Sequence, residues 1–226
     1  MLVKVGNVQK NYTLGKTIVP ALRGINLSIR EGEFVSVAGA SGSGKSTLLN
    51  LIGCLDKPSS GEVWIGGRQV NLLSERELNA IRLKSIGFIF QAFNLISVLN
   101  VRENVELPLL IRKDISQKER GKRVARFIEA VGLTAQARQR PAELSGGQRQ
   151  RVAVARALVT YPKLVLADEP TANLDSKTGL EVIDLMQAIN REYKTTFVFS
   201  THDPKIMQRA SVIYHIEDGA LQSDMA

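Results

Sequence analysis

The sequence predicts an α/β fold, in which a mainly parallel sheet forms the core, an antiparallel β layer lies beside it, and an α-helical subdomain is inserted. Two observations indicate this fold: short β-branched or aromatic runs alternate with helical patterns, and turn or polar residues follow each run. The runs that predict buried strands are Phe34 to Ala38, Ile86 to Phe90, Leu164 to Ala167 and Thr196 to Ser200. Strands that alternate with helices in this way are typical of a parallel sheet.

The first of these runs begins a strand, loop and helix unit. Phe34 to Ala38 is followed by a Gly-rich turn and then by a helical pattern from about Lys45 to Cys54. Nearer the N-terminus, Leu27 to Ile29, Glu62 to Ile65 and the turn Gly66-Gly67 predict the small antiparallel layer.

The middle of the chain predicts the helical insertion. Between Ser116 and Val131, apolar residues recur at helical spacing, and Gly132 is placed to end the helix. We expect a single domain spanning residues 1–226, with a core formed by residues 1–90 and 161–226 and a helical subdomain formed by residues 91–160.

Composition limits the class of protein. The 226 residues include 44% hydrophobic and 23% charged residues, which is typical of a globular chain with a sizeable core. The longest apolar runs have the length of strands, and Met1 to Gly6 lacks the pattern of a secretory signal, so we expect a cytoplasmic protein. The single cysteine, Cys54, cannot form an internal disulfide and is interpreted as packing within a helical stretch. The formal net charge of +8 is spread along the chain, with a loose cluster from Lys113 to Arg126, and favours a solvated face near an anionic membrane over a nucleic-acid site.

A phosphate-binding loop is the strongest functional motif. Residues Gly39 to Thr47 read GASGSGKST, which fits G-x-x-x-x-G-K-[S/T] between a predicted strand and a predicted helix. Lys45 is expected to reach the β- and γ-phosphates, and Ser46 to place its hydroxyl on Mg²⁺. The residues expected to contact ATP in this loop are Gly39, Ser41, Gly42, Ser43, Gly44, Lys45, Ser46 and Thr47. The motif therefore predicts the core of a P-loop NTPase.

Two acids follow the apolar run Leu164 to Ala167. A parallel strand delivers such residues to the carboxyl edge of its sheet, where ligands bind. Asp168 is a candidate for the Mg²⁺ site, and Glu169 is placed to deprotonate the attacking water. Acids at a strand end are also common turn residues, and the phosphate loop is what favours the catalytic interpretation.

The segment Leu144 to Arg151, which reads LSGGQRQR, lies shortly before those acids, and with it the sequence resembles the ABC (ATP-binding cassette) ATPase family. Ser145 and Gln148 form a capping box at the start of a helix, and with Gly146 and Gly147 they make a second anion-facing helix N-terminus. The resemblance implies a head-to-tail dimer of two copies, in which the Ser145 loop of one closes over the γ-phosphate on the Lys45 loop of the other.

The resemblance also implies roles for four residues elsewhere in the chain. Tyr12 is similar to the aromatic on which adenine stacks, although a tyrosine of the core is the alternative. Gln91 resembles the glutamine that touches Mg²⁺ and the attacking water, and His202 resembles the histidine that contacts the γ-phosphate; both are counted as catalytic together with Glu169 and Lys45. Asp175 resembles the acid of the loop that couples the two sites, next to an Asn173 where relatives often carry a small residue.

Within the family, the segments Leu51 to Asp56, Phe90 to Leu95 and Glu103 to Leu109 resemble the bacterial branch of lipoprotein-releasing, macrolide-export and antimicrobial-peptide-export ATPases. That branch implies an integral membrane permease as partner, with the chain peripheral on the inner face of the membrane. Apolar residues between Gln91 and Leu110 either form a groove for this partner or pack the helical subdomain. A soluble ABC ATPase acting on nucleic acid or ribosomes is the alternative, although we expect no nucleic-acid partner.

Overall fold

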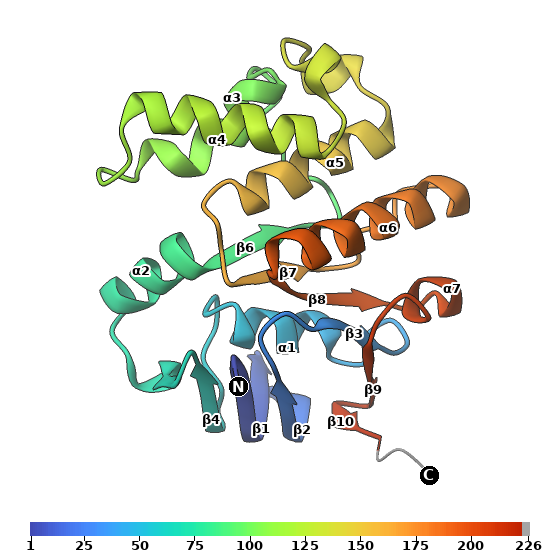
Figure 1. Cartoon of the computed structure of the whole chain (residues 1–226). Helices are drawn as coiled ribbons and strands as arrows, with labels where there is room; N and C mark the ends of the chain where they lie inside the picture. The colour runs from blue at the N-terminus through green and yellow to red at the C-terminus, as the bar shows by residue number, and fades with distance from the viewer. Residues whose placement is uncertain (223–226) are drawn as a thin grey trace.

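A computed structural model describes residues 1–222, which form two sheets and a set of helices (Figure 1). The larger sheet has the strand order β10-β9-β3-β8-β7-β6, and its strands pair in parallel except for β10, which is antiparallel to β9. Its strands are β3 (Phe34–Ala38), β6 (Ile86–Ile89), β7 (Leu164–Ala167), β8 (Thr196–Thr201), β9 (Val212–Glu217) and β10 (Ala220–Leu221). The predicted parallel core is confirmed. Strands β3, β7 and β8 are buried along their whole lengths, because other elements cover both faces of the sheet, and this explains their continuous apolar runs.

The smaller sheet is antiparallel, with the order β2-β1-β4-β5. Its strands are β1 (Val3–Leu14), β2 (Thr17–Ile29), β4 (Ser60–Ile65) and β5 (Arg68–Gln69). The predicted layer is confirmed but is larger than its predicted segments, because β1 and β2 form a long hairpin. One face of that hairpin carries polar side chains, and this obscures the apolar signal on which strand prediction depends.

Helices surround the larger sheet (Figure 1). They are α1 (Lys45–Ile52), α2 (Glu75–Ser85), α3 (Val101–Leu110), α4 (Gln117–Ala130), α5 (Gly146–Leu158), α6 (Ser176–Tyr193) and α7 (Pro204–Met207), with 3₁₀ turns at Val70–Leu72, Thr134–Gln136 and Pro141–Glu143. The helix predicted between Ser116 and Val131 is confirmed as α4, and Gly132 follows it with a left-handed φ of 71°.

The predicted end of the first helix is wrong. Helix α1 ends at Ile52, and Cys54 lies beyond it in a left-handed conformation with a φ of 56°. The apolar pattern continues past the helix because Cys54 remains buried in the core, so its packing role is confirmed although its helical position is not.

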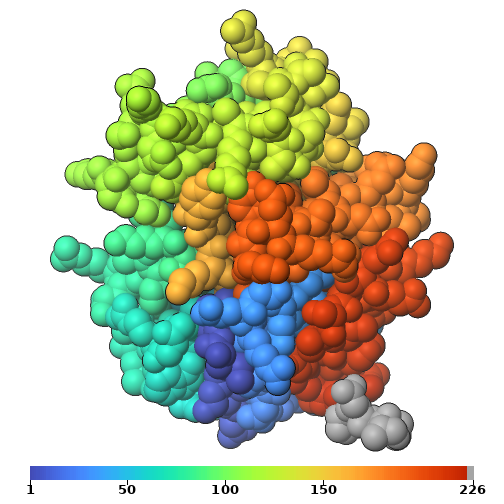
Figure 2. Space-filling model, viewed as in Figure 1, coloured from blue at the N-terminus to red at the C-terminus, as the bar shows by residue number. Residues whose placement is uncertain are grey.

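Two apolar clusters cover opposite faces of the larger sheet. Leu164 and Leu166 of β7 pack with the antiparallel sheet and α1, whereas Val165 and Ala167 of the same strand pack with helices α3 to α6. Alternation along one strand sends successive side chains to opposite faces. Figure 2 accordingly shows the yellow-green helical residues on one side of the molecule, and the blue residues of the N-terminal strands with the red residues that precede position 223 towards the other.

The Gly87 backbone of β6 approaches helix α5 closely. A Cβ atom at Gly87 would lie 2.3 Å from the Ala157 carbonyl oxygen, so only glycine permits this approach. Helix α5 packs on α3 and α4 as well as on β6, and it thereby joins the helical layer to the sheet. Among residues 1–222, no helix is long and apolar enough to span a bilayer.

Candidate functional site

The phosphate loop connects β3 to α1 and lines a pocket at the carboxyl edge of the sheet. The pocket is lined by Ala21, Ser41, Gly42, Gly44, Lys45, Ser46, Thr47, Gln91 and Glu169. The structure thus brings together most of the residues that the sequence predicts to contact ATP, joined by Ala21, Gln91 and Glu169 from distant parts of the chain. Gly39 and Ser43 belong to the same loop but do not line this pocket, and Ser43 is buried.

Glycine is required at different positions of the loop for different structural reasons. A Cβ atom at Gly39 would lie 2.2 Å from the Ile216 carbonyl oxygen, and one at Gly44 would lie 2.7 Å from the Ala21 carbonyl oxygen. At Gly42 a Cβ atom would meet nothing within 4 Å, and the left-handed φ of 81° alone favours glycine there. Gly42 therefore leaves an open space on the pocket side, through which a phosphate can approach the backbone.

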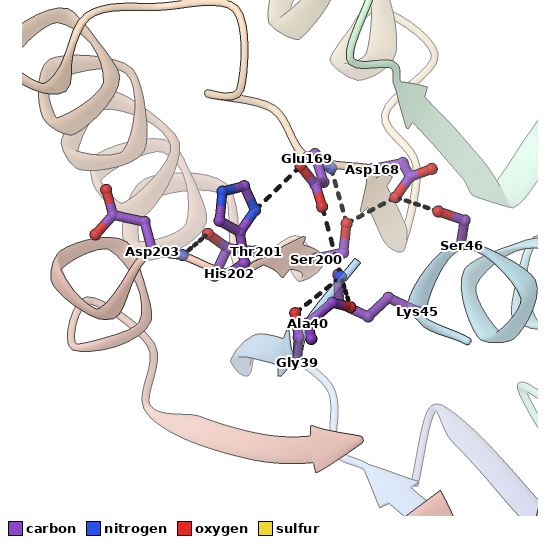
Figure 3. A network of polar contacts seen from close by, with 10 residues as sticks. All are labelled: Gly39, Ala40, Lys45, Ser46, Asp168, Glu169, Ser200, Thr201, His202 and Asp203. Atoms are coloured by element: carbon purple, nitrogen blue, oxygen red, sulfur yellow. Dashed lines mark hydrogen bonds and ion pairs between the residues drawn. The ribbon is translucent and has the colours of Figure 1, made fainter. Parts of the chain in front are cut away.

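Lys45 lies at the floor of the pocket. Its side chain is 5% exposed, and its ammonium donates hydrogen bonds to the carbonyl oxygens of Gly39 at 2.9 Å and Ala40 at 2.8 Å. The same ammonium lies 3.5 Å from Glu169 Oε1 (Figure 3). A cation is thus fixed where the loop presents its N–H groups, which is the arrangement that binds phosphate.

Asp168 and Ser46 meet beside the loop. The Ser46 hydroxyl donates to Asp168 Oδ1 at 3.0 Å, and the Ser200 hydroxyl donates to the same oxygen at 2.7 Å. Hydroxyl, carboxylate and amide oxygens from Ser46, Asp168 and the nearby Gln91 suit Mg²⁺, which uses few protein ligands and completes its shell with phosphates and water. The donor set therefore fits the predicted metal.

Glu169 turns out of the strand into the pocket. Its φ of 42° is left-handed, which is rare for a side chain of this size, and its N–H donates to Ser200 Oγ at 2.8 Å. Its Oε2 atom lies 3.3 Å from Nδ1 of His202, whose side chain is 62% exposed. Glu169 thus stands between Lys45 and His202 (Figure 3).

Ser200 is a site residue that the sequence analysis missed. Its hydroxyl accepts from the Glu169 backbone and donates to Asp168, so it holds both acids. The parallel register pairs Ala167 of β7 with Phe199 of β8, and the next residues along the two strands are Asp168 and Ser200. Asp168 and Ser200 lie close together only because β7 and β8 are neighbouring strands, and this strand order was not predicted from the sequence.

Gln91 follows β6 and lines the Lys45 pocket, as predicted from its position. Its carbonyl oxygen accepts a hydrogen bond from Asn173 Nδ2 at 2.9 Å. Asn173 therefore ties the loop after Glu169 to the segment after β6.

The predicted capping box at the start of α5 is confirmed. Ser145 Oγ accepts from the Gln148 N–H at 3.2 Å, and the Ser145 N–H donates to Gln148 Oε1 at 2.9 Å. A Cβ atom at Gly147 would lie 2.4 Å from Thr178 Cγ2, so Gly147 is needed for packing inside the chain, whereas one at Gly146 would lie 3.1 Å from Leu174 Cδ2, which a small shift of the leucine can accommodate. None of the four residues Ser145 to Gln148 lines the Lys45 pocket.

Asp175 caps helix α6. Its carboxylate accepts the Thr178 N–H at 3.0 Å. Hydrogen bonds from the Thr178 side chain and then from the Thr178 backbone lower the pKa of Asp175. Asp175 thus stabilises the N-terminus of α6 within a single chain, independently of any contact with a second copy.

Tyr12 lies on β1, does not line the Lys45 pocket, and is half-buried outside both core clusters. Its hydroxyl donates to Asp56 Oδ2 at 3.0 Å. Burial and then the hydrogen bond with Asp56 raise the pKa of Tyr12, and a side-chain hydrogen bond with Thr47 of the phosphate loop opposes them.

A family model described as ABC transporter matches residues 22–172, which include the phosphate loop, the segment Leu144 to Arg151 (hereafter the signature segment) and both acids. The chain belongs to the ABC transporter family. The predicted resemblance is confirmed, and the chain is an ATP-binding subunit of an ABC transporter with ATPase activity.

Relatives cover nearly the whole chain. An uncharacterised ABC transporter ATP-binding protein of Methanocaldococcus jannaschii, MJ0796, is 48% identical over 226 residues, which are 99% of this chain and 96% of that protein. The lipoprotein-releasing system ATP-binding protein LolD of Coxiella burnetii is 44% identical over 96% of this chain and 93% of its own length.

Solved structures of ABC ATPases share the fold. A dimeric post-hydrolysis state of the MJ0796 cassette bound to ADP and Pi has a TM-score of 0.89 and 48% identity, over 98% of this chain and 97% of that one. The cbiO1 subunit of the cbiONQ transporter of Clostridium perfringens has a TM-score of 0.88 and 30% identity, over 98% of this chain and 87% of that one. These matches support transport and give no support to the alternative of action on nucleic acid or ribosomes.

Proposed function

We propose that this ABC transporter subunit binds ATP with Mg²⁺ on its Lys45 loop and dimerises head to tail with a second copy of itself. The observation that carries the proposal is that one chain has two anion-facing helix N-termini, at Lys45 and at Ser145, and that only the first lines the ATP pocket. The Ser145 helix of one copy completes the site of the other. The dimeric MJ0796 cassette with ADP and Pi supports this arrangement.

The residues around Glu169 suit hydrolysis of the γ-phosphate. Lys45 and the loop N–H groups bind the phosphates, and bound Mg²⁺ would neutralise charge on the transferred group from its site at Ser46 and Asp168. Glu169 holds the attacking water and takes its proton. His202, 3.3 Å from Glu169, fixes the direction of the carboxylate. Gln91 lines the same pocket and would contact the attacking water and the bound metal.

The proposal also assigns roles to Tyr12, to the residues around Ser145, to Asp175 and to the two parts of the chain. Tyr12 stacks on adenine, and Gly146, Gly147 and Gln148 accompany Ser145 at the γ-phosphate of the partner copy. Asp175 couples the two sites across the dimer. Residues 91–160 act as the helical subdomain, and residues 1–90 with 161–226 act as the nucleotide-binding core.

An integral membrane permease is the proposed membrane partner, with the chain peripheral on the cytoplasmic face. A groove between the helical layer and the sheet is lined by Phe88, Phe90, Pro108 and Arg156, among others. Of the apolar residues that follow Gln91, Ile96 and Val98 are exposed and accessible to a permease, whereas Leu95 packs on the core. We propose a permease of the lipoprotein-release, macrolide-export or peptide-export type, and the similarity to LolD supports the first of these.

Mixed dimers test the cross-chain site. Lys45→Ala removes the ammonium of the phosphate loop, and Ser145→Arg fills the opposing helix N-terminus, so each variant alone is expected to be inactive. A mixture of the two forms heterodimers in which one site has intact residues from both chains, and ATP hydrolysis should partly return. Activity that stays absent in the mixture, while both variants are folded and Ser145→Arg still binds ATP, would refute the head-to-tail site.

The permease is tested by co-expression. Pull-down of the chain from solubilised membranes together with the permease encoded beside it should succeed and should fail when Ile96 and Val98 are both changed to aspartate. Retention of the complex by that double variant would refute the docking surface, and binding to RNA in place of the permease would favour the rejected alternative.

A further inference from the structure

Three side chains form an ordered cluster beside the phosphate loop. Lys10 and Tyr12 lie on β1 on either side of a register shift, and their side chains meet at Asp56, which follows α1 in the loop towards β4. Lys10 Nζ donates to Asp56 Oδ1 at 2.7 Å and to the Lys57 carbonyl oxygen at 2.8 Å. Its side chain is only 12% exposed. The ammonium is therefore fixed in place.

The fixed ammonium covers one face of the Tyr12 ring. Lys10 Nζ lies 4.9 Å from the ring centroid, within the range of a cation–π interaction. The Tyr12 hydroxyl donates to Asp56 Oδ2 at 3.0 Å, so the ring is held at its tip as well as at its face. An aromatic ring has two faces, and with Lys10 on one of them a base can stack only on the other.

Hydrogen bonds hold both carboxylate oxygens of Asp56. It accepts hydrogen bonds from Lys10, from the Lys57 N–H at 2.7 Å and from Tyr12. Burial would raise the pKa of Asp56, but the hydrogen bonds from Lys10, Lys57 and Tyr12 outweigh it, and the pKa is lowered. Asp56 thus stays ionised and connects the ammonium to the ring hydroxyl.

We infer that Lys10 and Asp56 are positioning residues that hold the Tyr12 ring in the orientation in which adenine stacks on it, with the ammonium on the opposite face. This inference rests on the proposed role of Tyr12 as the adenine contact. It assigns the affinity for the base to a cluster outside the phosphate loop. A side chain that is ordered before binding loses less entropy when the base arrives, and the affinity rises accordingly.

The inference predicts that loss of Lys10 or Asp56 weakens binding of the adenine base and leaves binding of the phosphates unchanged. Calorimetry on the full chain measures Kd for Mg-ATP and for inorganic tripolyphosphate with Mg²⁺. Lys10→Met and Asp56→Asn should each weaken ATP binding about two- to tenfold and leave tripolyphosphate binding unchanged. Lys10→Arg, which keeps a cation over the ring, should restore most of the affinity for ATP.

Lys16 provides the matched control. It is exposed in the turn between β1 and β2, and Lys16→Met removes the same charge without touching the ring. This variant should bind both ligands as the unchanged chain does. Equal losses for ATP and tripolyphosphate in Lys10→Met, or equal losses in Lys10→Met and Lys16→Met, would overturn the inference.

Tyr12→Ala separates the inference from the proposal on which it rests. This variant should weaken ATP binding about 5- to 150-fold, the range for loss of base stacking on an aromatic ring. If Tyr12→Ala binds ATP normally, the adenine role itself is wrong. If Tyr12→Ala weakens ATP binding and Lys10→Met does not, the adenine role stands and the positioning role of Lys10 and Asp56 is refuted.

Discussion

The side-chain amide of Gln150 donates a hydrogen bond to the Pro170 carbonyl oxygen at 2.7 Å. Gln150 is fully buried in α5, the helix that begins after Ser145, and Pro170 directly follows Glu169. The helix that carries the signature segment is thereby tied to the backbone beside the catalytic acid. In the proposed dimer, Ser145 and Glu169 of one chain belong to different ATP sites, so this hydrogen bond directly connects the two sites.

Removing that amide should damage both stability and turnover. Gln150→Leu leaves the Pro170 carbonyl without its donor, which should lower the free energy of unfolding by about 1–3 kcal/mol. Turnover should fall more than the KM for ATP changes, because Glu169 loses its fixed position while the phosphate loop is intact. Urea unfolding and steady-state ATPase assays measure the two effects. Gln187→Leu, which removes a more exposed amide that donates to the Arg209 carbonyl, is the control and should leave turnover unchanged.

Gly147 should tolerate alanine only when its neighbour is trimmed. In Gly147→Ala the new Cβ atom would lie 2.4 Å from Thr178 Cγ2, and this overpacking should lower the free energy of unfolding by about 1–3 kcal/mol. Thr178→Ser removes the clashing methyl group, so the double variant should recover most of the loss. Thermal unfolding of the single and double variants checks this. A double variant as unstable as Gly147→Ala would show that the clash is not the cause.

The cap of α6 should make stability depend on pH. The pKa of Asp175 is lowered in the folded chain by hydrogen bonds from Thr178, so its ionised cap stabilises the fold above the unfolded pKa of about 3.9. That contribution is lost as the pH falls through the lower folded pKa. Asp175→Asn also caps the helix but does not titrate. The unfolding free energy of the unchanged chain minus that of Asp175→Asn should therefore shrink between neutral pH and about pH 3. A difference that is constant with pH would contradict the capping role.

Glu169→Gln should separate binding from hydrolysis. The amide keeps the size of the side chain but cannot take a proton, so turnover should fall at least about a hundredfold while ATP still binds. Phosphate release and nucleotide-binding assays measure the two quantities. Glu143→Gln, an exposed acid in the 3₁₀ turn before the signature segment, is the control and should turn over normally. Unchanged hydrolysis in Glu169→Gln would refute the assignment of the base.

The parts of the site that the sequence predicts are those encoded in consecutive residues. The phosphate loop, the acids after β7 and the Ser145 capping box each lie in one short segment, where the local pattern decides the geometry. Ser200 beside Asp168 and Gln150 beneath Pro170 were not predicted, because these contacts depend on strand order and on helix packing between distant segments. Cys54 shows the same limit in the fold, since buried apolar residues continue past the end of a helix.

Light scattering on Glu169→Gln tests the central claim most directly, because this variant should hold ATP without consuming it. With Mg²⁺ and ATP the mass should double from one chain to two, and adding Ser145→Arg to the same chain should abolish the doubling while ATP still binds. A mass of one chain in saturating ATP, or a dimer that forms equally well with Ser145→Arg, would contradict a site completed by a second copy.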